Sequence, residues 1–323
     1  MAAVFLLLFT ALVACVDPDA PMDPTNTSEF VFEVPKGSTA YGVGPALVEQ
    51  GLVPSEFQWK RFVKSEDASC LKAGKFSVSP SMSMRNILET LCGLPLPDDI
   101  PFTVVEGWRI RDIDEALAKA KLIQPGEYKT LAESKGAESP FEVPSPTLEG
   151  YLWPETYKVS PTAFSAKKFI ERQLTMFNER FMEAHAKDVE KRGLHGVVVM
   201  ASLLEREEPK PENRPLVAGI LWKRLDRGWQ LGVDATSRYQ LVNWNDRKGF
   251  LAHLRDPEDP YNTRIHHGLP PTAIGNPTLS SLEAALNPKS SDFWFYLHDK
   301  NQNLHPARNG DEHDANRAKY DIY

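Results

Sequence analysis

A glutamate on an apolar helix is the residue of this sequence whose setting best suits acid–base chemistry. The run VVVMASLLERE predicts a helix over residues 197–206, and Glu205 shares one of its faces with Val198, Ala201 and Ser202. An apolar face partly desolvates a carboxyl group, which disfavours the charged form and raises the pKa. A glutamate becomes a general acid near neutral pH in this way.

The same spacing also allows Glu205 to end the helix in water. A single carboxylate does not define a site, and from spacing alone this plainer interpretation is the favoured one. The next residues, Arg206, Glu207 and Glu208, point away from the apolar face, and we expect them to be solvated.

Further polar groups lie later in the chain, among apolar residues and prolines. Those that could line a site are Asp234, Thr236, Tyr261, Asn262 and Thr263. Five of the eight histidines also lie late, namely His266, His267, His298, His305 and His313. They match no compact metal-binding spacing, so we expect no metal. GxSxG, GxGxxG and P-loop patterns are absent, which removes the usual hydrolase and nucleotide-binding signatures.

Composition places limits on the class of protein. The 323 residues suggest about two domains. With 41% hydrophobic and 25% charged residues, the composition is that of an ordinary globular protein. A net charge of −7 gives no basic footprint, so nucleic acid is not an expected partner. A mean hydropathy of −0.38 argues against a polytopic membrane protein.

The first fifteen residues, MAAVFLLLFTALVAC, are apolar and carry no charged side chain. They are short for a membrane span, which needs about 20 residues, and they suit the core of an export signal. The end of this run, LVAC, resembles the bacterial lipoprotein box and makes Cys15 a candidate for lipidation. A plain cleaved signal and an uncleaved anchor are the alternatives. Each of the three places the rest of the chain outside the cytoplasm, and residues 1–28 then form an anchor and a tether.

The two other cysteines agree with export. Cys70 and Cys92 form an even pair in a setting where disulfides persist, so a bridge between them is plausible. Two buried thiols are nearly as plausible.

The elements that must position these residues do not alternate regularly, which favours an α+β fold over a doubly wound sheet. Residues 29–97 predict a small module of strands and helices, and residues 98–146 predict a second strand–turn–helix element with a linker. Residues 147–323 predict a larger α+β domain. The helices expected in these regions span residues 41–51, 83–93, 110–120, 165–186, 197–206 and 216–225, and a strand is expected at 293–297.

Four sequence blocks, in order, resemble the endolytic murein transglycosylase (YceG-like) family. They are LEGYLWPETY at 148–157, ASLLERE at 201–207, Asp234-Ala235-Thr236 with Tyr239, and the run from Tyr261-Asn262-Thr263 through Gly268-Leu269-Pro270-Pro271 to Asn276-Pro277. His313 and Tyr320 also keep the family's spacing. Residues 32–91 resemble the LysM-like N-terminal module of that family.

The resemblance implies a specific reaction. Members of the family cut the bond between N-acetylmuramic acid and N-acetylglucosamine inside nascent peptidoglycan strands and leave 1,6-anhydro ends, and this cleavage is expected to end strand growth beside the synthases. It places the catalytic glutamate at Glu205 and requires no cofactor. It makes Glu149, Tyr151, Asp234 and Thr236, with the segment Tyr261–Thr263, candidates for substrate binding. The expected partners are glycan strands, peptidoglycan synthases and the inner membrane, and the expected location is the cell envelope, facing the periplasm.

The chain departs from the family pattern at Gly232, where the family has a glutamine. One alternative function is therefore a peptidoglycan-binding lipoprotein without catalytic activity. Another is a hydrolase in which Asp234 serves as a second acid beside Glu205.

Overall fold

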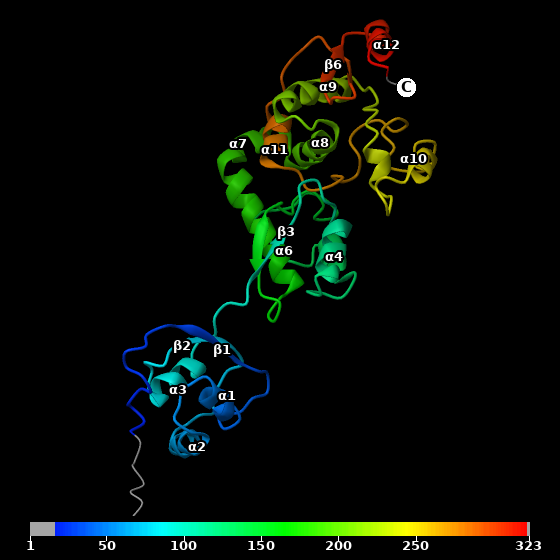
Figure 1. Ribbon diagram of the computed structural model, residues 1–323. Coiled ribbons are helices and arrows are strands. Elements are labelled where there is room, and N and C mark those ends of the chain that lie inside the picture. Colours follow the sequence, from blue (N-terminus) through cyan, green and yellow to red (C-terminus); the bar gives the residue numbers. More distant parts are fainter. Residues whose placement is uncertain (1–16, 322–323) are drawn as a thin grey trace, which may run out of the picture. The chain divides into compact units, whose positions relative to one another are not determined.

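The computed structural model describes residues 17–321, and they divide into two compact units between Asp98 and Asp99 (Figure 1). The candidate lipidation site at Cys15 lies outside the described residues. Within residues 17–321, no helix is both long enough and apolar enough to cross a membrane.

The first unit is built on a two-stranded antiparallel sheet. Its elements in chain order are β1 (Phe30–Val34), α1 (Gly44–Glu49), α2 (Glu56–Ser65), β2 (Gly74–Val78) and α3 (Met84–Cys92). Phe32 lies opposite Phe76 in the register, and both side chains point into a core that also holds Trp59. The alternation of buried and exposed residues along the strands explains this arrangement, because successive side chains point to opposite faces.

Residues 17–28, predicted from the sequence to be a tether, form hydrogen bonds and an ion pair with this unit. The N–H group of Asp23 donates to the carbonyl oxygen of Pro80 at 3.0 Å, and Arg85 on α3 pairs with Asp19 at 2.7 Å. Their polar composition therefore reflects a surface segment that lies along the unit through backbone and side-chain hydrogen bonds.

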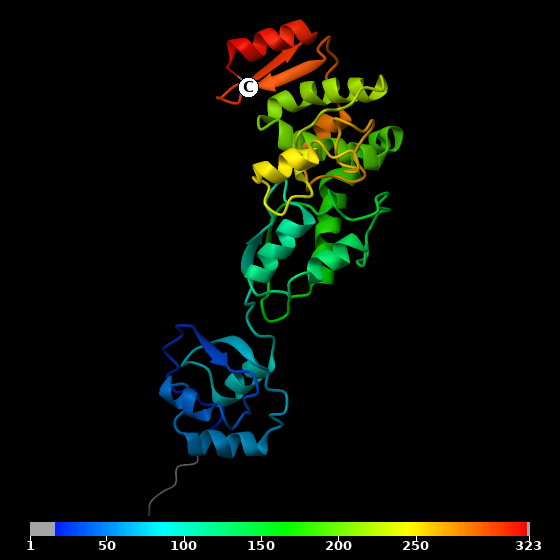
Figure 2. The same cartoon turned by 90° about the vertical axis from the view of Figure 1, so that its right-hand side faces the viewer.

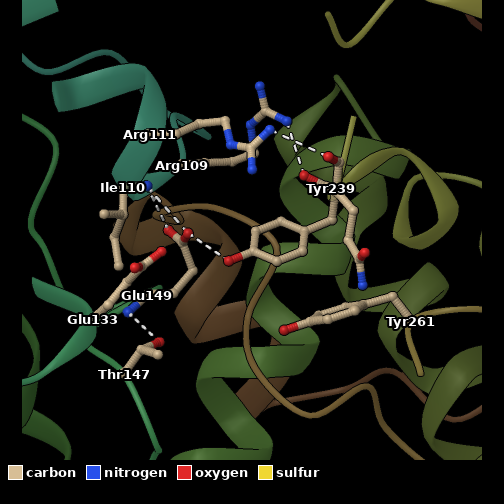
Figure 3. A pocket seen from close by; sticks show the side chains of 9 residues that line it. Arg109, Ile110, Arg111, Glu133, Thr147, Glu149, Tyr239 and Tyr261 are labelled. Carbon is tan, nitrogen blue, oxygen red and sulfur yellow. Dashed lines mark hydrogen bonds between the residues drawn. The ribbon is translucent and has the colours of Figure 1, made fainter. Parts of the chain in front are cut away.

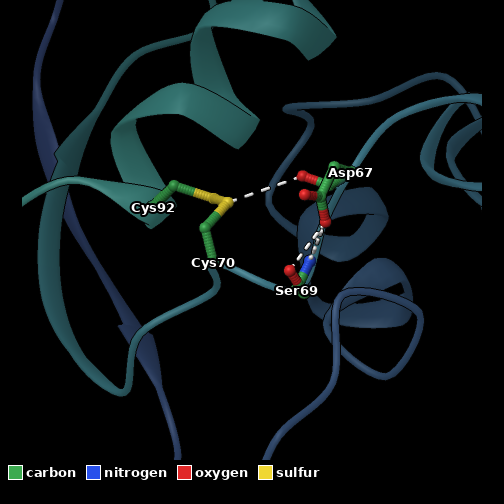
Figure 4. The surroundings of a disulfide bond; sticks show 4 residues. All are labelled: Asp67, Ser69, Cys70 and Cys92. Carbon is green, nitrogen blue, oxygen red and sulfur yellow. Dashed lines mark hydrogen bonds between the residues drawn. A yellow bond between two sulfur atoms is a disulfide. The ribbon is translucent and has the colours of Figure 1, made fainter.

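A disulfide joins Cys70, after α2, to Cys92 at the end of α3 (Figure 4). The bond closes a loop that contains β2, and it joins the segment between α2 and β2 to the end of α3. Beside it, the carboxylate of Asp67 accepts hydrogen bonds from Ser69 and shapes the turn.

The second unit is mixed helix and sheet, which confirms the predicted α+β class. Its first half contains β3 (Ile100–Thr103), α4 (Ile110–Lys119), α5 (Glu127–Glu133), β4 (Thr156–Val159), α6 (Ala166–Phe177), the π-helical turn η1 (Asn178–Met182) and α7 (Glu183–Arg192). Its second half contains α8 (Leu194–Glu207), η2 (Pro211–Asn213), α9 (Arg214–Asp226), η3 (Thr236–Arg238), α10 (Arg247–His253), α11 (Leu279–Leu286), β5 (Phe295–His298), β6 (Leu304–Ala307) and α12 (Gly310–Lys319).

The expected division near residue 146 is absent from the structure. β3 pairs with β4 in an antiparallel sheet, with Phe102 opposite Tyr157. Residues 98–146 therefore complete a sheet with the start of the expected catalytic domain. A strand partner more than fifty residues away leaves no local signal in the sequence, which is the reason the pattern suggested a separate element.

Helix α8 lies at the centre of the second unit and packs against α9 and α11 (Figures 1 and 2). Its residues from Val197 to Leu204 are all buried. A helix that is apolar on all sides is expected in the interior rather than at the surface. Lys, Arg, Asp and Glu side chains occur only in its last turn, where Glu205, Arg206 and Glu207 are partly buried. β5, β6 and α12 pack together beside α9.

The disulfide makes the stability of the first unit sensitive to reduction. Replacing both Cys70 and Cys92 by serine is expected to lower the free energy of unfolding of this unit by about 3 kcal/mol. The reason is that the bond reduces the conformational entropy of the unfolded chain. Denaturant unfolding of the chain from residue 17 onward, followed by fluorescence and circular dichroism, measures this change. The transition of the second unit serves as the internal control. Equal stability of the bridged and serine forms would contradict the prediction.

Candidate active site

The last turn of α8 sends four consecutive charged side chains to four different places. Glu205 points to the start of α11, and Arg206 reaches the carbonyl oxygen of Gly107. Glu207 lines a cavity below β5, whereas Glu208 is buried and bonded to His298 at 2.9 Å. Because the helix turns by about 100° per residue, neighbours in sequence face different surroundings.

Glu205 is held by a dense set of donors. Its Oε2 accepts hydrogen bonds from the backbone N–H of Thr278 at 2.9 Å, from the Thr278 hydroxyl at 2.6 Å and from the Ser281 hydroxyl at 2.8 Å. Its Oε1 pairs with Arg214 at 3.1 Å, and the side chains of this pair are 9% and 6% exposed. A carboxylate at the first turn of a helix, beside a buried guanidinium, is stabilised in place. Glu205 therefore joins α8, α9 and α11.

Glu207, two residues further on, is only partly buried and faces open space. The hydroxyl of Tyr296 on β5 donates to its Oε2 at 3.1 Å. Burial raises the pKa of Glu207, and the negative charge of Asp234 raises it further, while the hydrogen bonds from Tyr296 and from the backbone of Ala235 act against this rise. These are the properties of a carboxyl group that can both hold and release a proton.

The cavity beside Glu207 has a volume of about 450 Å³. It is lined by side chains that suit a sugar, since flat apolar rings can stack on pyranose faces and polar groups can bind hydroxyls. The aromatic members are Trp229, Phe295 and Tyr296, and the polar members are Glu207, Arg224, Gln230, Asp234, Arg264, His298 and His313. Trp229 is 44% exposed and leans on Trp294, with 4.5 Å between the ring centroids.

Asp234 and Gly232 also border this cavity. Asp234 pairs with Arg264 at 2.7 Å, and both side chains are about half exposed. Gly232 has a φ of +63°, and a Cβ built on it would meet no atom closer than Arg224 Nη1 at 4.0 Å. A side chain here is disfavoured by the backbone rather than by crowding. The departure from the family's glutamine therefore leaves this wall of the cavity open.

Glu149 lies in a second cavity, of about 470 Å³, that Figure 3 shows from close by. Both of its carboxyl oxygens accept from the N–H of Ile110 at 3.1 Å, and the hydroxyl of Tyr239 donates to it at 2.9 Å. Burial raises the pKa of Glu149 to about 8, against the effect of these two donors. The residue is only 1% exposed, so it links α4 to the segment around Tyr239 and has little surface to offer a ligand.

The remaining candidates from the sequence are largely internal. Tyr151 lies in the aromatic core against Phe141 and Phe177. The hydroxyls of Thr236 and Thr263 lie 3.1 Å apart, and Thr263 Oγ1 accepts from the N–H of Val233 at 3.0 Å.

Asn262 is also an internal residue, because its side-chain amide donates to backbone carbonyls of the loop after α10. Tyr261 borders the Glu149 cavity and bonds to Thr272 at 2.7 Å. Of the polar candidates, Asp234 is thus the one that shares a cavity with Glu207.

The apolar face of α8 favours Glu205 as the candidate acid, because Glu205 is the carboxyl group on that face. That face packs inside the protein, and its carboxyl group forms a buried ion pair with Arg214. The sequence predicts a solvated Glu207, which belongs to the same ASLLERE block, whereas the structure gives it intermediate burial. Its distinguishing contacts come from β5, almost ninety residues away in the sequence, and carry no local signal. Among residues 17–321, no group of three or more His, Cys, Asp or Glu side chains is arranged to hold a metal ion.

Comparison with known proteins agrees with this arrangement of elements. The endolytic murein transglycosylase of Bacillus subtilis is 26% identical over 316 residues, covering 93% of this chain and 87% of the relative. The protein of the same name from Streptococcus pneumoniae D39 is 24% identical and covers 94% of this chain and 61% of the relative.

A crystal structure of a Listeria monocytogenes protein described as yceG-like superimposes with a TM-score of 0.59 at 24% identity, covering 89% of this chain and 99% of that one, which is a likeness of fold. A sequence model of the YceG-like family matches residues 32–319. Because this match takes in most of the chain, the chain belongs to the YceG-like family.

Proposed function

We propose that this protein is an endolytic peptidoglycan lytic transglycosylase in which Glu207 is the general acid and base. Its relatives named endolytic murein transglycosylase support the reaction class. The observation that carries the assignment is the position of Glu207: its partly exposed carboxyl lines the aromatic cavity, and burial and the charge of Asp234 raise its pKa. Glu205 is fully engaged with Arg214 and α11, so we revise its expected catalytic role to one of positioning α8.

One carboxyl group is enough for this reaction. Glu207 gives its proton to the glycosidic oxygen, and the bond between that oxygen and C1 of N-acetylmuramic acid breaks. The 6-hydroxyl oxygen of the same sugar then bonds to C1, and its proton passes to the Glu207 carboxylate. The products are a strand with a free 4-hydroxyl and a strand with a 1,6-anhydro end. Glu207 returns to its starting state, and neither water nor a second carboxylate is consumed.

The surroundings of Glu207 fit the two halves of this cycle. Burial favours the protonated acid at the start, whereas the hydrogen bond from Tyr296 stabilises the carboxylate that forms when the bond breaks. Trp229 and Phe295 offer ring faces for the sugars, and Asp234 with Arg264 forms a polar wall for hydroxyl and amide groups.

The other sequence-based expectations fit a role in the cell envelope. The first unit is proposed to be a LysM-like glycan-binding module, which its strand–helix–helix–strand order supports. We propose lipidation at Cys15, a membrane anchor and a place facing the periplasm on the basis of the apolar N-terminal run and its LVAC end. A partnership with peptidoglycan synthases follows from the family resemblance and is likewise a proposal. Glu149, Tyr151 and Thr236, with Tyr261, Asn262 and Thr263, are proposed to shape the walls of the site rather than to contact sugar.

The rival functions make different products. A hydrolase with Asp234 as its second acid would leave reducing ends, and a binding protein would leave strands uncut. The pairing of Asp234 with Arg264 disfavours the hydrolase, because that carboxylate already has a cationic partner. Mass spectrometry of the products formed from polymeric peptidoglycan distinguishes the three functions.

Two glutamine variants separate catalysis from positioning. Glu207→Gln is expected to lower cleavage about a thousandfold, since an amide cannot transfer the proton, while the free energy of unfolding changes by less than about 1 kcal/mol. Glu205→Gln is expected to lower the free energy of unfolding by about 3 kcal/mol, because the buried Arg214 loses its counter-charge. Under conditions in which this variant is folded, it keeps measurable cleavage.

Product analysis and denaturant unfolding of both variants, beside the wild-type chain, make this test. Full activity of Glu207→Gln, together with a folded and wholly inactive Glu205→Gln, would return the catalytic role to Glu205. No internal 1,6-anhydro ends from the wild-type chain would contradict the reaction itself.

The pH dependence of cleavage is expected to respond in opposite directions to two changes beside Glu207. Activity falls as pH rises through the pKa of the acid. Asp234→Asn removes a charge that raises this pKa, so the alkaline limb of kcat/KM moves to lower pH. Tyr296→Phe removes a hydrogen bond that lowers it, so the limb moves to higher pH. Shifts in the same direction, or none, would show that Glu207 is not the titrating acid.

A further inference from the structure

A second open groove, of about 450 Å³, begins on the other side of the last turn of α8. It is lined by Trp108, Arg109, Arg206 and Trp244 and by residues of one face of α4. The residues of that face, spaced three and four apart, are Asp112, Glu115, Ala116 and Lys119. The mechanism proposed above uses none of these side chains.

The charges in this groove are incompletely matched within the chain. The guanidinium of Arg206 lies 4.1 Å from the ring centre of Trp244 and donates to the carbonyl oxygen of Gly107. Within residues 17–321 it forms no ion pair, and its Nε is enclosed without an acceptor. Burial lowers the pKa of Arg206, and the negative charge of Asp112, which is itself paired with Arg109, raises it. Glu115 and Lys119 are exposed and form no ion pair with another described residue. A ligand with carboxylates and an amino group would complement all three side chains.

The position of the groove restricts what that ligand is. Arg206 and Glu207 are adjacent in sequence, so their Cα atoms are about 3.8 Å apart. A strand cut at Glu207 places an N-acetylmuramic acid there, and this sugar carries its peptide stem on C3, beside the bond that breaks. A stem that leaves the sugar beside this bond therefore starts close to the last turn of α8, which also carries Arg206. It is a short, alanine-rich peptide with free carboxylates and, where its third residue is a diamino acid, a free amino group.

We propose that the groove formed by Trp108, Arg206, Trp244 and the exposed face of α4 binds the peptide stem of the muramic acid at the cleavage site. In this arrangement Arg206 and Lys119 bind stem carboxylates, and Glu115 binds the amino group. The indole faces of Trp108 and Trp244 cover the alanine methyl groups. The proposal rests on the proposed function and extends it, because it makes cleavage depend on whether the strand carries stems.

The pattern of charge favours a peptide over a further sugar subsite. A neutral disaccharide would leave the partly buried Arg206 guanidinium with only the charges of neighbours that it does not pair with, such as Asp112, whereas a carboxylate forms charge-assisted hydrogen bonds with it. The cavity at Glu207 already offers aromatic faces for sugars. The two sites thus divide the substrate between its glycan and its peptide.

The test compares cleavage of stem-bearing strands with cleavage of strands from which an amidase has removed the stems. Arg206→Gln is expected to lower kcat/KM on stem-bearing strands about tenfold, as for the loss of one charge-assisted contact, and to change it less than about twofold on stem-free strands. Lys119→Gln alters an exposed side chain and cannot disturb the end of α8. It is expected to lower kcat/KM about threefold, again only on stem-bearing strands. Lys187→Gln, which changes an exposed lysine on α7 outside the groove, is the matched control.

A direct titration makes the result independent of cleavage. The tripeptide L-alanyl-γ-D-glutamyl-L-lysine is added to the wild-type chain and followed by calorimetry, with saturable binding expected. Arg206→Gln and Trp244→Leu should abolish this binding, whereas Glu207→Gln should keep it.

Equal losses on both substrates, no loss on either, or tripeptide binding that survives Arg206→Gln would each overturn the proposal. If the wild-type chain cuts only stem-bearing strands, the titration decides. Failure of the proposed function would be recognised separately, by full cleavage in the Glu207→Gln variant.

Discussion

The buried ion pair between Glu205 and Arg214 is the interaction on which the site depends. Both side chains are nearly inaccessible, so each charge has a large desolvation cost unless the other is present. Thr278 and Ser281 supply the remaining donors and connect the pair to the first turn of α11. This arrangement fixes the end of α8 in position and rotation. The side chains of Arg206, Glu207 and Glu208 are therefore each held in a different environment.

A second constraint holds the loops around that turn. Asn276 is fully buried, and its Oδ1 accepts from the N–H groups of Gly150 and Leu152 at 3.0 Å each. Its Nδ2 donates to the carbonyl oxygen of Trp108 at 2.9 Å, while its own carbonyl oxygen accepts from Gly107 at 2.7 Å. One amide thus joins three loops that precede α4, β4 and α11. Such a side chain satisfies backbone N–H and carbonyl groups in loops, where no helix or sheet pairs them.

The sequence predicts those parts of the fold whose information is local. Periodicity and caps place α3 and α8 within a few residues of their observed bounds, and Ser83 caps α3 as its position suggests. The polar helix α12 has no apolar face, so periodicity gives no sign of it. The pairing of β3 with β4 depends on a partner that is distant in sequence.

The site shows the same limit. Spacing identifies α8 as the helix that carries the acid, but not which of its glutamates faces substrate. That choice depends on which neighbours lie beside each carboxyl. Glu205 meets Arg214 and a helix start, and Glu207 meets Tyr296 and a cavity. Burial alone, which the apolar pattern does predict, points to Glu205, because it does not distinguish a satisfied interior charge from the partly exposed acid that we propose.

An intramolecular nucleophile suits the arrangement of carboxyl groups in this site. A hydrolase needs a second carboxylate to activate water, and the acidic side chain that shares the cavity with Glu207 is Asp234. Its negative charge is engaged by Arg264, so it acts on Glu207 through space, raising the pKa of the acid. A sugar that supplies its own 6-hydroxyl requires no base until the glycosidic bond breaks. In the proposed mechanism, Glu207 has lost its proton at that moment, and it becomes the base at the place where one is needed.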